Sequence, residues 1–140
     1  MIFKVIKIIF IYFLIINPSK ANTKFFEEGL DLFKNKKFDL AKFKFEQEIV
    51  LNPKSELSYL YLSKIFKNLD QKNLQEQNLN TVILLNPKNE EAIYNLVLLK
   101  LELSDYKKSK ELNNRLTKVC DRFCDRSKEL KIEIENLSKK

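Results

Sequence analysis

The chain has 140 residues, 44% of them hydrophobic and 32% charged, which suits one folded domain, and its single glycine and three prolines exclude a turn-rich β-fold. The scarcity of these turn residues favours an all-α protein. With no histidine and one glycine, the chain can build neither a His-based catalytic triad nor a phosphate-binding loop, so we expect no enzymatic activity, cofactor or metal. The formal net charge of +7 does not by itself predict a nucleic-acid partner, because part of it lies in a segment that we expect to be removed.

The N-terminal segment, residues 1–21, has the layout of a secretory signal peptide. Lys4 and Lys7 provide a positive start, and residues 8–16 are all apolar. Ser19 and Ala21 place small side chains three and one residues before a cleavage point after Ala21. We expect cleavage there, export across the inner membrane of a bacterium and a periplasmic location. Two alternatives stay open, a buried helix and an uncleaved anchor, and only the anchor would bring this protein to a membrane. The apolar run is shorter than the roughly 20 residues of a membrane span.

The middle of the chain is expected to form three helical hairpins. The tetrapeptide LNPK stands at residues 51–54 and again at residues 85–88, and apolar residues recur at three- and four-residue steps within each unit. Pro53 and Pro87 disfavour helix in the preceding residue, so one helix should end just before each proline. Ser55 and Asn89 are available to cap the helices that follow. The predicted units are residues 22–55, 56–88 and 89–123, which together cover residues 22–123.

A 34-residue helical hairpin that ends in proline resembles the tetratricopeptide repeat (TPR). In that family's order and spacing, the first unit has Phe25, Gly29, Phe38, Ala41, Phe45 and Pro53. The resemblance implies a right-handed α-solenoid in which small residues such as Gly29 and Ala41 let the paired helices approach closely. Aromatic residues such as Phe45 would fill the seam between them.

The second and third units depart from this pattern. Gln75 and Val97 stand where the family has small residues, and Asp121 stands where it has proline. A generic antiparallel helical bundle therefore stays open as an alternative fold.

The C-terminal segment, residues 124–140, is expected to be a capping helix. Leu130, Ile134 and Leu137 lie on one helical stripe in an otherwise charged segment. The last repeat of a solenoid exposes a hydrophobic face, and an amphipathic helix of this kind covers it.

Cys120 and Cys124 are one helical turn apart, which places their Cα atoms about 6 Å from each other, within the range of a disulfide. An exported protein meets an oxidising compartment, so we expect a disulfide that joins the cap to the last hairpin. Two free buried thiols and a redox-active pair are the alternatives.

The resemblance also implies a binding site, because the first helices of successive TPR units line a concave groove that holds a peptide or a partner helix. The residues expected in that groove are Phe26, Leu30, Phe33, Leu60, Lys64, Lys67, Tyr94, Leu98 and Leu101. Phe26 and Tyr94 are the expected aromatic anchors, although some of the nine residues can instead pack between neighbouring helices. The family's carboxylate clamp is not expected, because Phe26, Leu30 and Glu91 stand where it needs polar or basic side chains.

These features together predict an exported TPR scaffold that binds a protein or peptide partner through its groove and has no chemistry of its own. The alternative is an assembly or structural factor of the cell envelope, tethered by an uncleaved N-terminal apolar segment.

Overall fold

The structure, a computed structural model, describes residues 24–139, which form seven α-helices and no strand. The helices are α2 (Lys24–Lys34), α3 (Phe38–Leu51), α4 (Glu56–Asn68), α5 (Lys72–Leu85), α6 (Glu90–Glu102), α7 (Tyr106–Val119) and α8 (Cys124–Leu137). The all-α prediction is confirmed for this part of the chain. No described helix has the length and apolar content that crossing a bilayer requires. The predicted signal peptide, residues 1–21, lies outside the described residues.

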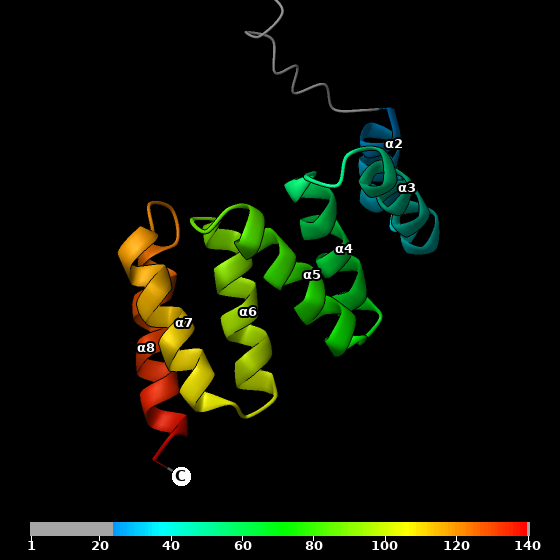
Figure 1. Cartoon of the computed structure of the whole chain (residues 1–140). Coiled ribbons are helices and arrows are strands. Elements are labelled where there is room, and N and C mark those ends of the chain that lie inside the picture. The colour runs from blue at the N-terminus through cyan, green and yellow to red at the C-terminus, as the bar shows by residue number, and fades with distance from the viewer. Residues whose placement is uncertain (1–23, 140) are drawn as a thin grey trace, which may run out of the picture.

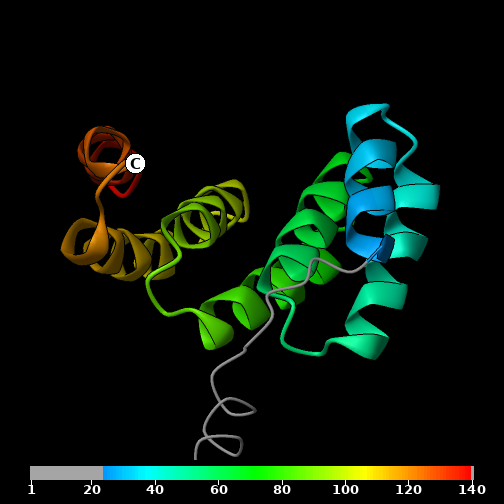
Figure 2. The same cartoon turned by 90° about the horizontal axis from the view of Figure 1, so that it is seen from above.

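The helices are arranged in hairpins that follow one another along the molecule. Packing is most extensive between α2 and α3, between α4 and α5, and between α6 and α7, and α8 packs on α7. Figure 1 shows α2 and α3 at one end of the molecule and α7 and α8 at the other. In the view from above, the α4–α5 pair lies between the first hairpin and the group of α6, α7 and α8 (Figure 2).

The turn inside each hairpin has the same backbone conformation. Its residue of positive φ is Lys36 (58°) in the first hairpin, Asp70 (54°) in the second and Ser104 (57°) in the third. These three positions recur at the same interval along the chain as the two LNPK copies. The repeat in the sequence is therefore also a repeat in backbone geometry.

Two hydrogen bonds end the first helix at each of these turns. In the first hairpin the Lys36 N–H donates to the Phe33 carbonyl at 3.0 Å, and the Lys37 N–H donates to the Leu32 carbonyl at 2.9 Å. This Schellman arrangement gives partners to carbonyls that the helix end leaves free. The position of positive φ usually holds glycine, which has no Cβ to strain there.

The connections between hairpins contain the prolines. Helix α3 ends at Leu51 and α5 ends at Leu85, two residues before Pro53 and Pro87. The predicted helix ends are confirmed, because proline has no N–H to continue the helical hydrogen bonds.

Of the two helix caps predicted after the prolines, one is confirmed and one is wrong. Asn89 caps α6, because its side-chain oxygen accepts a hydrogen bond from the Ala92 N–H at 2.8 Å. Ser55 makes no such bond to α4, and that prediction is wrong. Its Oγ lies instead 2.8 Å from the Oγ of Ser58, a buried hydroxyl that needs a partner.

The first hairpin and α4 enclose an aromatic core around Phe45, which is fully buried. A Cβ on Gly29 would stand 2.9 Å from a ring carbon of Phe45, so α2 and α3 approach more closely than any other residue would allow. Ala41, on the same side of α3 as Phe45, is also fully buried. The small residues and the seam aromatic have the roles that were predicted for them.

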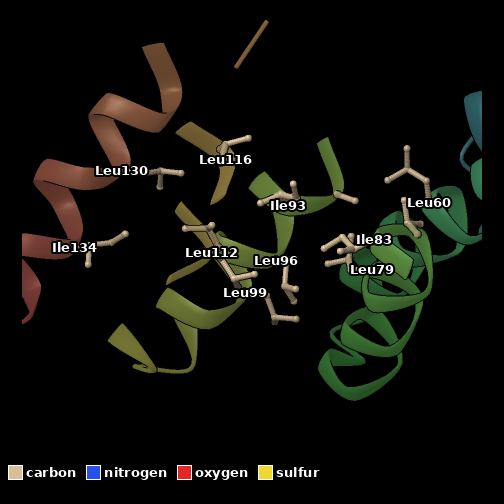
Figure 3. Close-up of a cluster of buried hydrophobic side chains, with 13 residues drawn as sticks. Leu60, Leu79, Ile83, Ile93, Leu96, Leu99, Leu112, Leu116, Leu130 and Ile134 are labelled. Atoms are coloured by element: carbon tan, nitrogen blue, oxygen red, sulfur yellow. The ribbon is translucent and has the colours of Figure 1, made fainter. Parts of the chain in front are cut away.

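A second, larger core runs from α4 to α8. Figure 3 shows its side chains, from Leu60 at one end to Leu130 and Ile134 at the other. Leu130 and Ile134 are 4% and 2% exposed, and Leu137 is half-buried. Helix α8 therefore covers the end of the last hairpin with the predicted stripe.

Polar contacts fix the position of α8 on α7. The Asn113 Nδ2 donates to the Ser127 carbonyl at 2.9 Å, and the Ser127 Oγ donates to the Asn113 Oδ1 at 3.1 Å. Asn113 stands where the first two hairpins have Phe45 and Leu79. A buried hydrogen-bonded pair specifies one arrangement of the two helices, which a purely apolar seam would not.

The second and third hairpins are also each tied to the segment that follows them. Glu56, the first residue of α4, accepts hydrogen bonds through Oε1 from the side chains of Asn86, at 3.0 Å, and of Asn89. These two asparagines flank Pro87, just before α6. Glu90, one repeat length after Glu56, makes the equivalent contact to the segment before α8.

Candidate functional site

The nine residues predicted to line a groove come from α2, α4 and α6, the first helices of the three hairpins. Two of them, Phe26 and Leu60, are each only 4% exposed. The others are half-buried or, for Lys67, exposed: Leu30, Phe33, Lys64, Lys67, Tyr94, Leu98 and Leu101. We call these seven accessible residues, together with their neighbours Tyr61, Phe123 and Arg126, the first-helix surface.

Phe26 is a core residue, and its prediction as an accessible anchor is wrong. Its ring centroid lies 5.7 Å from that of Phe45 and 6.0 Å from that of Tyr61. Because α4 packs beside the first hairpin, Tyr61 covers the side of α2 that a single hairpin would expose. The prediction that Leu60 lines the groove is wrong for a similar reason, because Leu60 belongs to the larger core.

Tyr61 was not among the predicted site residues, yet it forms one end of the first-helix surface. Its ring stacks on Phe45, with centroids 5.3 Å apart and planes 14° apart, and meets the ring of Phe33 edge-on at 5.1 Å. Tyr61 itself is half-buried. Phe33 on α2 and Tyr61 on α4 are therefore both partly accessible at this end of the surface.

Lys64 is held in the middle of the surface by two neighbours. Its Nζ lies 2.7 Å from the Glu91 Oε1 and 4.7 Å from the ring centroid of Tyr61. A cation over an aromatic face is attracted by the ring quadrupole, and the carboxylate offsets its charge. Lys64 therefore contributes its methylene chain and little free positive charge, whereas Lys67 is exposed.

Tyr94 lies at the other end of the surface, among side chains from the start of α8. Its ring centroid is 5.2 Å from that of Phe123, and the Arg126 guanidinium lies 5.4 Å from the Tyr94 ring and 5.2 Å from the Phe123 ring. Leu98 and Leu101 follow along α6 and pack partly against the larger core. The two ends of the surface are thus aromatic, and the span between them is mixed.

The segment that carries Phe123 is held in place from α6. The Glu90 Oε2 accepts hydrogen bonds from the backbone N–H groups of Asp121, Arg122 and Phe123 at 2.8, 3.0 and 2.9 Å. Burial raises the pKa of Glu90, but the three N–H donors and the positive charge of Arg122 outweigh it, so this pKa lies below its usual value of 4.5.

The two cysteines close the same segment. The sulfur atoms of Cys120 and Cys124 are at disulfide distance, and their Cα atoms lie 5.2 Å apart. The segment is therefore bounded by the cysteine pair and held at its middle by Glu90. Phe123 reaches Tyr94 from this fixed position.

The described cavities do not coincide with the first-helix surface. An open cavity of about 410 Å³ lies at the turn from α4 to α5, lined by residues 70–74. The first-helix surface is instead a shallow face of aromatic and aliphatic side chains with few free charges. Such a face can recognise the side chains of another protein by burying them.

Comparisons with known proteins bear on the fold. No protein-family model matches the sequence, and no curated protein matches it either. Among solved structures, the chain is similar to the type III secretion chaperone SycD of Yersinia enterocolitica in complex with a peptide of the translocator YopD, with a TM-score of 0.74 and 12% identity over 87% of this chain and 97% of that one.

Two further structures are similar over most of their length. One is the TPR domain of Sgt2 from Aspergillus fumigatus, with a TM-score of 0.72 and 18% identity over 88% of this chain and 85% of that one. The other is the first TPR of Spaghetti (RPAP3) bound to the HSP90 peptide SRMEEVD, with a TM-score of 0.69 and 18% identity over 82% of this chain and 88% of that one. The chain has a TPR fold.

In this TPR fold, three residues of the surface escaped the sequence analysis. Tyr61 directly follows Leu60, so a stripe placed one residue later on α4 would have included it. Phe123 and Arg126 lie after the third hairpin, where the 34-residue period carries no signal for a groove. Only the contact from Glu90, far away in the sequence, places Phe123 there.

Proposed function

We propose that this protein is an exported TPR scaffold that binds a peptide or a helical segment of a partner protein through the first-helix surface, and that it has no catalytic activity. The observation that carries the proposal is the pair of half-buried aromatic sites, Phe33 with Tyr61 and Tyr94 with Phe123, on a TPR fold. Structures with this fold include one bound to an HSP90 peptide and one bound to a YopD peptide.

The chemistry of the surface favours an apolar partner segment. Lys64 is paired with Glu91, so it is not free to hold a terminal carboxylate. Affinity should come from aromatic and aliphatic side chains that lose their water on binding, because few residues of an interface supply most of its energy. A partner segment with bulky apolar side chains suits these two aromatic sites.

The first experiment is a peptide selection on the full chain, with binding of the selected peptides measured by fluorescence polarisation. Tyr94→Ala should weaken the binding of these peptides by about 1–3 kcal/mol, roughly 5- to 150-fold, as the loss of an anchor does. Leu84→Ala is the matched control, since Leu84 is 80% exposed on α5 and outside the surface. Peptides that bind equally well to Tyr94→Ala would refute this site.

Export rests on the N-terminal sequence pattern, and a cysteine pair at disulfide distance suits an oxidising compartment. The alternative function, an envelope assembly or structural factor, needs the N-terminal apolar segment to be retained as a tether. N-terminal sequencing of the exported protein separates the two. A chain that starts at Asn22 supports the released scaffold, and a chain that starts at Met1 supports the tethered factor.

A further inference from the structure

Helix α3 has an apolar face that no described part of the chain covers. Its residues are Leu40 (56% exposed), Phe43 (55%), Val50 (79%) and Leu51 (64%). They lie on the side of α3 opposite to Ala41 and Phe45, which pack into the core. We call these four residues the α3 stripe.

The third hairpin has mostly charged residues at the same positions, and two of them, Glu111 and Lys118, are exposed. Two repeat lengths further along, the counterparts of the α3 stripe are Lys108, Glu111, Lys118 and Val119 on α7. Three of these four are charged. The second hairpin has Leu74, Gln77, Leu84 and Leu85 at these positions, and its Leu74 and Leu84 are also exposed. The face is therefore most apolar at α3, where all four residues are apolar and exposed, and least apolar at α7. Contiguous exposed apolar patches of roughly 300–600 Å² often mark interaction sites.

Basic residues accompany the stripe. The turn that leads into α3 has three exposed lysines, Lys34, Lys36 and Lys37. Asp39, the second residue of α3, and Glu46 are exposed along the other edge of the helix, so the three lysines stand against two acids. An apolar helix face next to a lysine cluster is the combination that binds anionic lipid surfaces.

The stripe also ends where the chain enters the fold. A cavity of about 210 Å³ at the start of α2 is lined by Phe25, Gln47, Val50 and Leu51. The sequence just before α2 contains the apolar residues 8–16, and only residues 17–23 separate them from α2. A linker of this length spans at most about 25 Å. If residues 8–16 sit in a bilayer, whether before cleavage or as an anchor, α3 is close to its surface.

We propose that the α3 stripe, with the lysines of the preceding turn, rests on the surface of an anionic bilayer. The stripe belongs to the second helix of the first hairpin and shares no residue with the first-helix surface, so a partner and a membrane can be bound together. A second copy of the chain is the less suitable occupant. Four side chains of this size expose on the order of 400 Å², about half of the roughly 800 Å² per partner that a stable dimer buries.

The test uses the full chain with a single tryptophan, because the natural sequence has none. Phe43→Trp places the reporter in the stripe, and Leu84→Trp places a control at a more exposed apolar site on α5. Vesicles contain equal parts of phosphatidylglycerol and phosphatidylcholine, with brominated phosphatidylcholine as the quencher. The reporter at position 43 should shift to shorter wavelength and be quenched by the brominated lipid, whereas the reporter at position 84 should not change.

A further variant tests the charge. Phe43→Trp combined with Lys36→Glu and Lys37→Glu should lose the shift and the quenching, as should the single variant with vesicles of phosphatidylcholine alone. An unchanged reporter at position 43 on vesicle-bound protein overturns the proposal, since the N-terminal segment would then be the sole attachment. Equal quenching at positions 43 and 84 also overturns the proposal, because the protein would then adsorb to the vesicles without preference for the α3 stripe. A blue shift of the reporter at position 43 in the absence of vesicles also overturns the proposal. If that shift depends on protein concentration, a second copy of the chain covers the stripe, and if it does not, the chain's own N-terminal segment covers it.

Discussion

Tyr61 is one of the α4 residues through which the first two hairpins contact each other. It stacks on Phe45, meets Phe26 and Phe33 edge-on, and has Lys64 over its ring. One side chain therefore belongs to the aromatic core and to the first-helix surface at once. Substitutions at Tyr61 are poor tests of binding, because they change stability as well, whereas Tyr94 is further from the aromatic core.

The first prediction concerns Phe26. Phe26→Ala should lower the free energy of unfolding by about 3–5 kcal/mol, as truncation of a buried aromatic side chain leaves a cavity. Phe45→Ala should cost a similar amount, because both rings are almost fully buried. Urea unfolding followed by circular dichroism measures both variants. A Phe26→Ala variant as stable as the natural chain would show that the ring is exposed in solution, as the sequence pattern had suggested.

At the scale of the helices, the turns inside the hairpins have a conformational cost that the chain does not avoid. Lys36, Asp70 and Ser104 adopt a positive φ, which costs a residue with a Cβ about 1–2 kcal/mol. In Ser104→Gly the relief of this cost is partly cancelled by the greater conformational freedom of glycine in the unfolded chain. The variant should therefore raise the free energy of unfolding by about 0.5–1 kcal/mol.

The control for this prediction is Ser138→Gly. Ser138 ends α8 with φ −74°, so glycine brings no relief there and should lower stability slightly or leave it unchanged. Thermal unfolding of both variants gives the comparison. If Ser104→Gly is destabilising, the turn does not hold its positive φ in solution.

Glu90 supports the next prediction, on the segment between α7 and α8. Glu90→Gln should loosen residues 121–123, because a neutral amide oxygen accepts backbone hydrogen bonds more weakly than a carboxylate. Hydrogen exchange of the Asp121, Arg122 and Phe123 amides should become faster, while exchange within α2 and α3 should not change. Unaltered exchange at all three amides would contradict the role assigned to Glu90.

The same variant has a defined pH dependence. The pKa of Glu90 is lowered in the folded protein, so its carboxylate stabilises the fold above the unfolded pKa, and this contribution is lost as the pH falls through the folded pKa. The difference in stability between the natural chain and Glu90→Gln should therefore be largest near neutral pH. It should shrink as the pH falls below about 4.5.

For the molecule as a whole, the cysteine pair determines how firmly the C-terminal cap is joined to the hairpins. If Cys120 and Cys124 are oxidised, the protein should resist thiol alkylation and react only after reduction. The pair closes a short loop, so the chain-entropy model assigns it about 2 kcal/mol of stability, less than a long loop would gain. Ready alkylation of unreduced protein by mass spectrometry would show two free thiols instead.

The repeat made much of this architecture predictable. The 34-residue period indicated the hairpins, the prolines marked where α3 and α5 end, and the stripe of Leu130 and Ile134 predicted the cap. What the period could not supply was the angle at which one hairpin packs on the next. That angle decides whether Phe26 faces a groove or Tyr61, and it depends on all the side chains in the seam at once.

The candidate site was predictable in part for the same reason. Tyr94, Leu98 and Leu101 are accessible where the pattern placed them, but Leu60 turned inward. Phe123 could not be predicted, because its position depends on hydrogen bonds to Glu90, 33 residues before it. A periodic pattern describes what each unit has in common and says little about the contacts where the last unit meets the cap.

The reach of those contacts has a consequence for how the chain folds. The side-chain hydrogen bonds that join one hairpin to the next segment, from Glu56, Glu90 and Arg115, span between 28 and 33 residues. Most residue pairs in contact are close in sequence, within a helix or between neighbouring helices, so contact order is low, which favours rapid folding. A hairpin that leaves a ribosome or a membrane pore has to wait for only about one further repeat before its tie to the next segment can form. The protein can thus acquire structure progressively from its N-terminal end, with little unfolded chain exposed to other proteins at any moment.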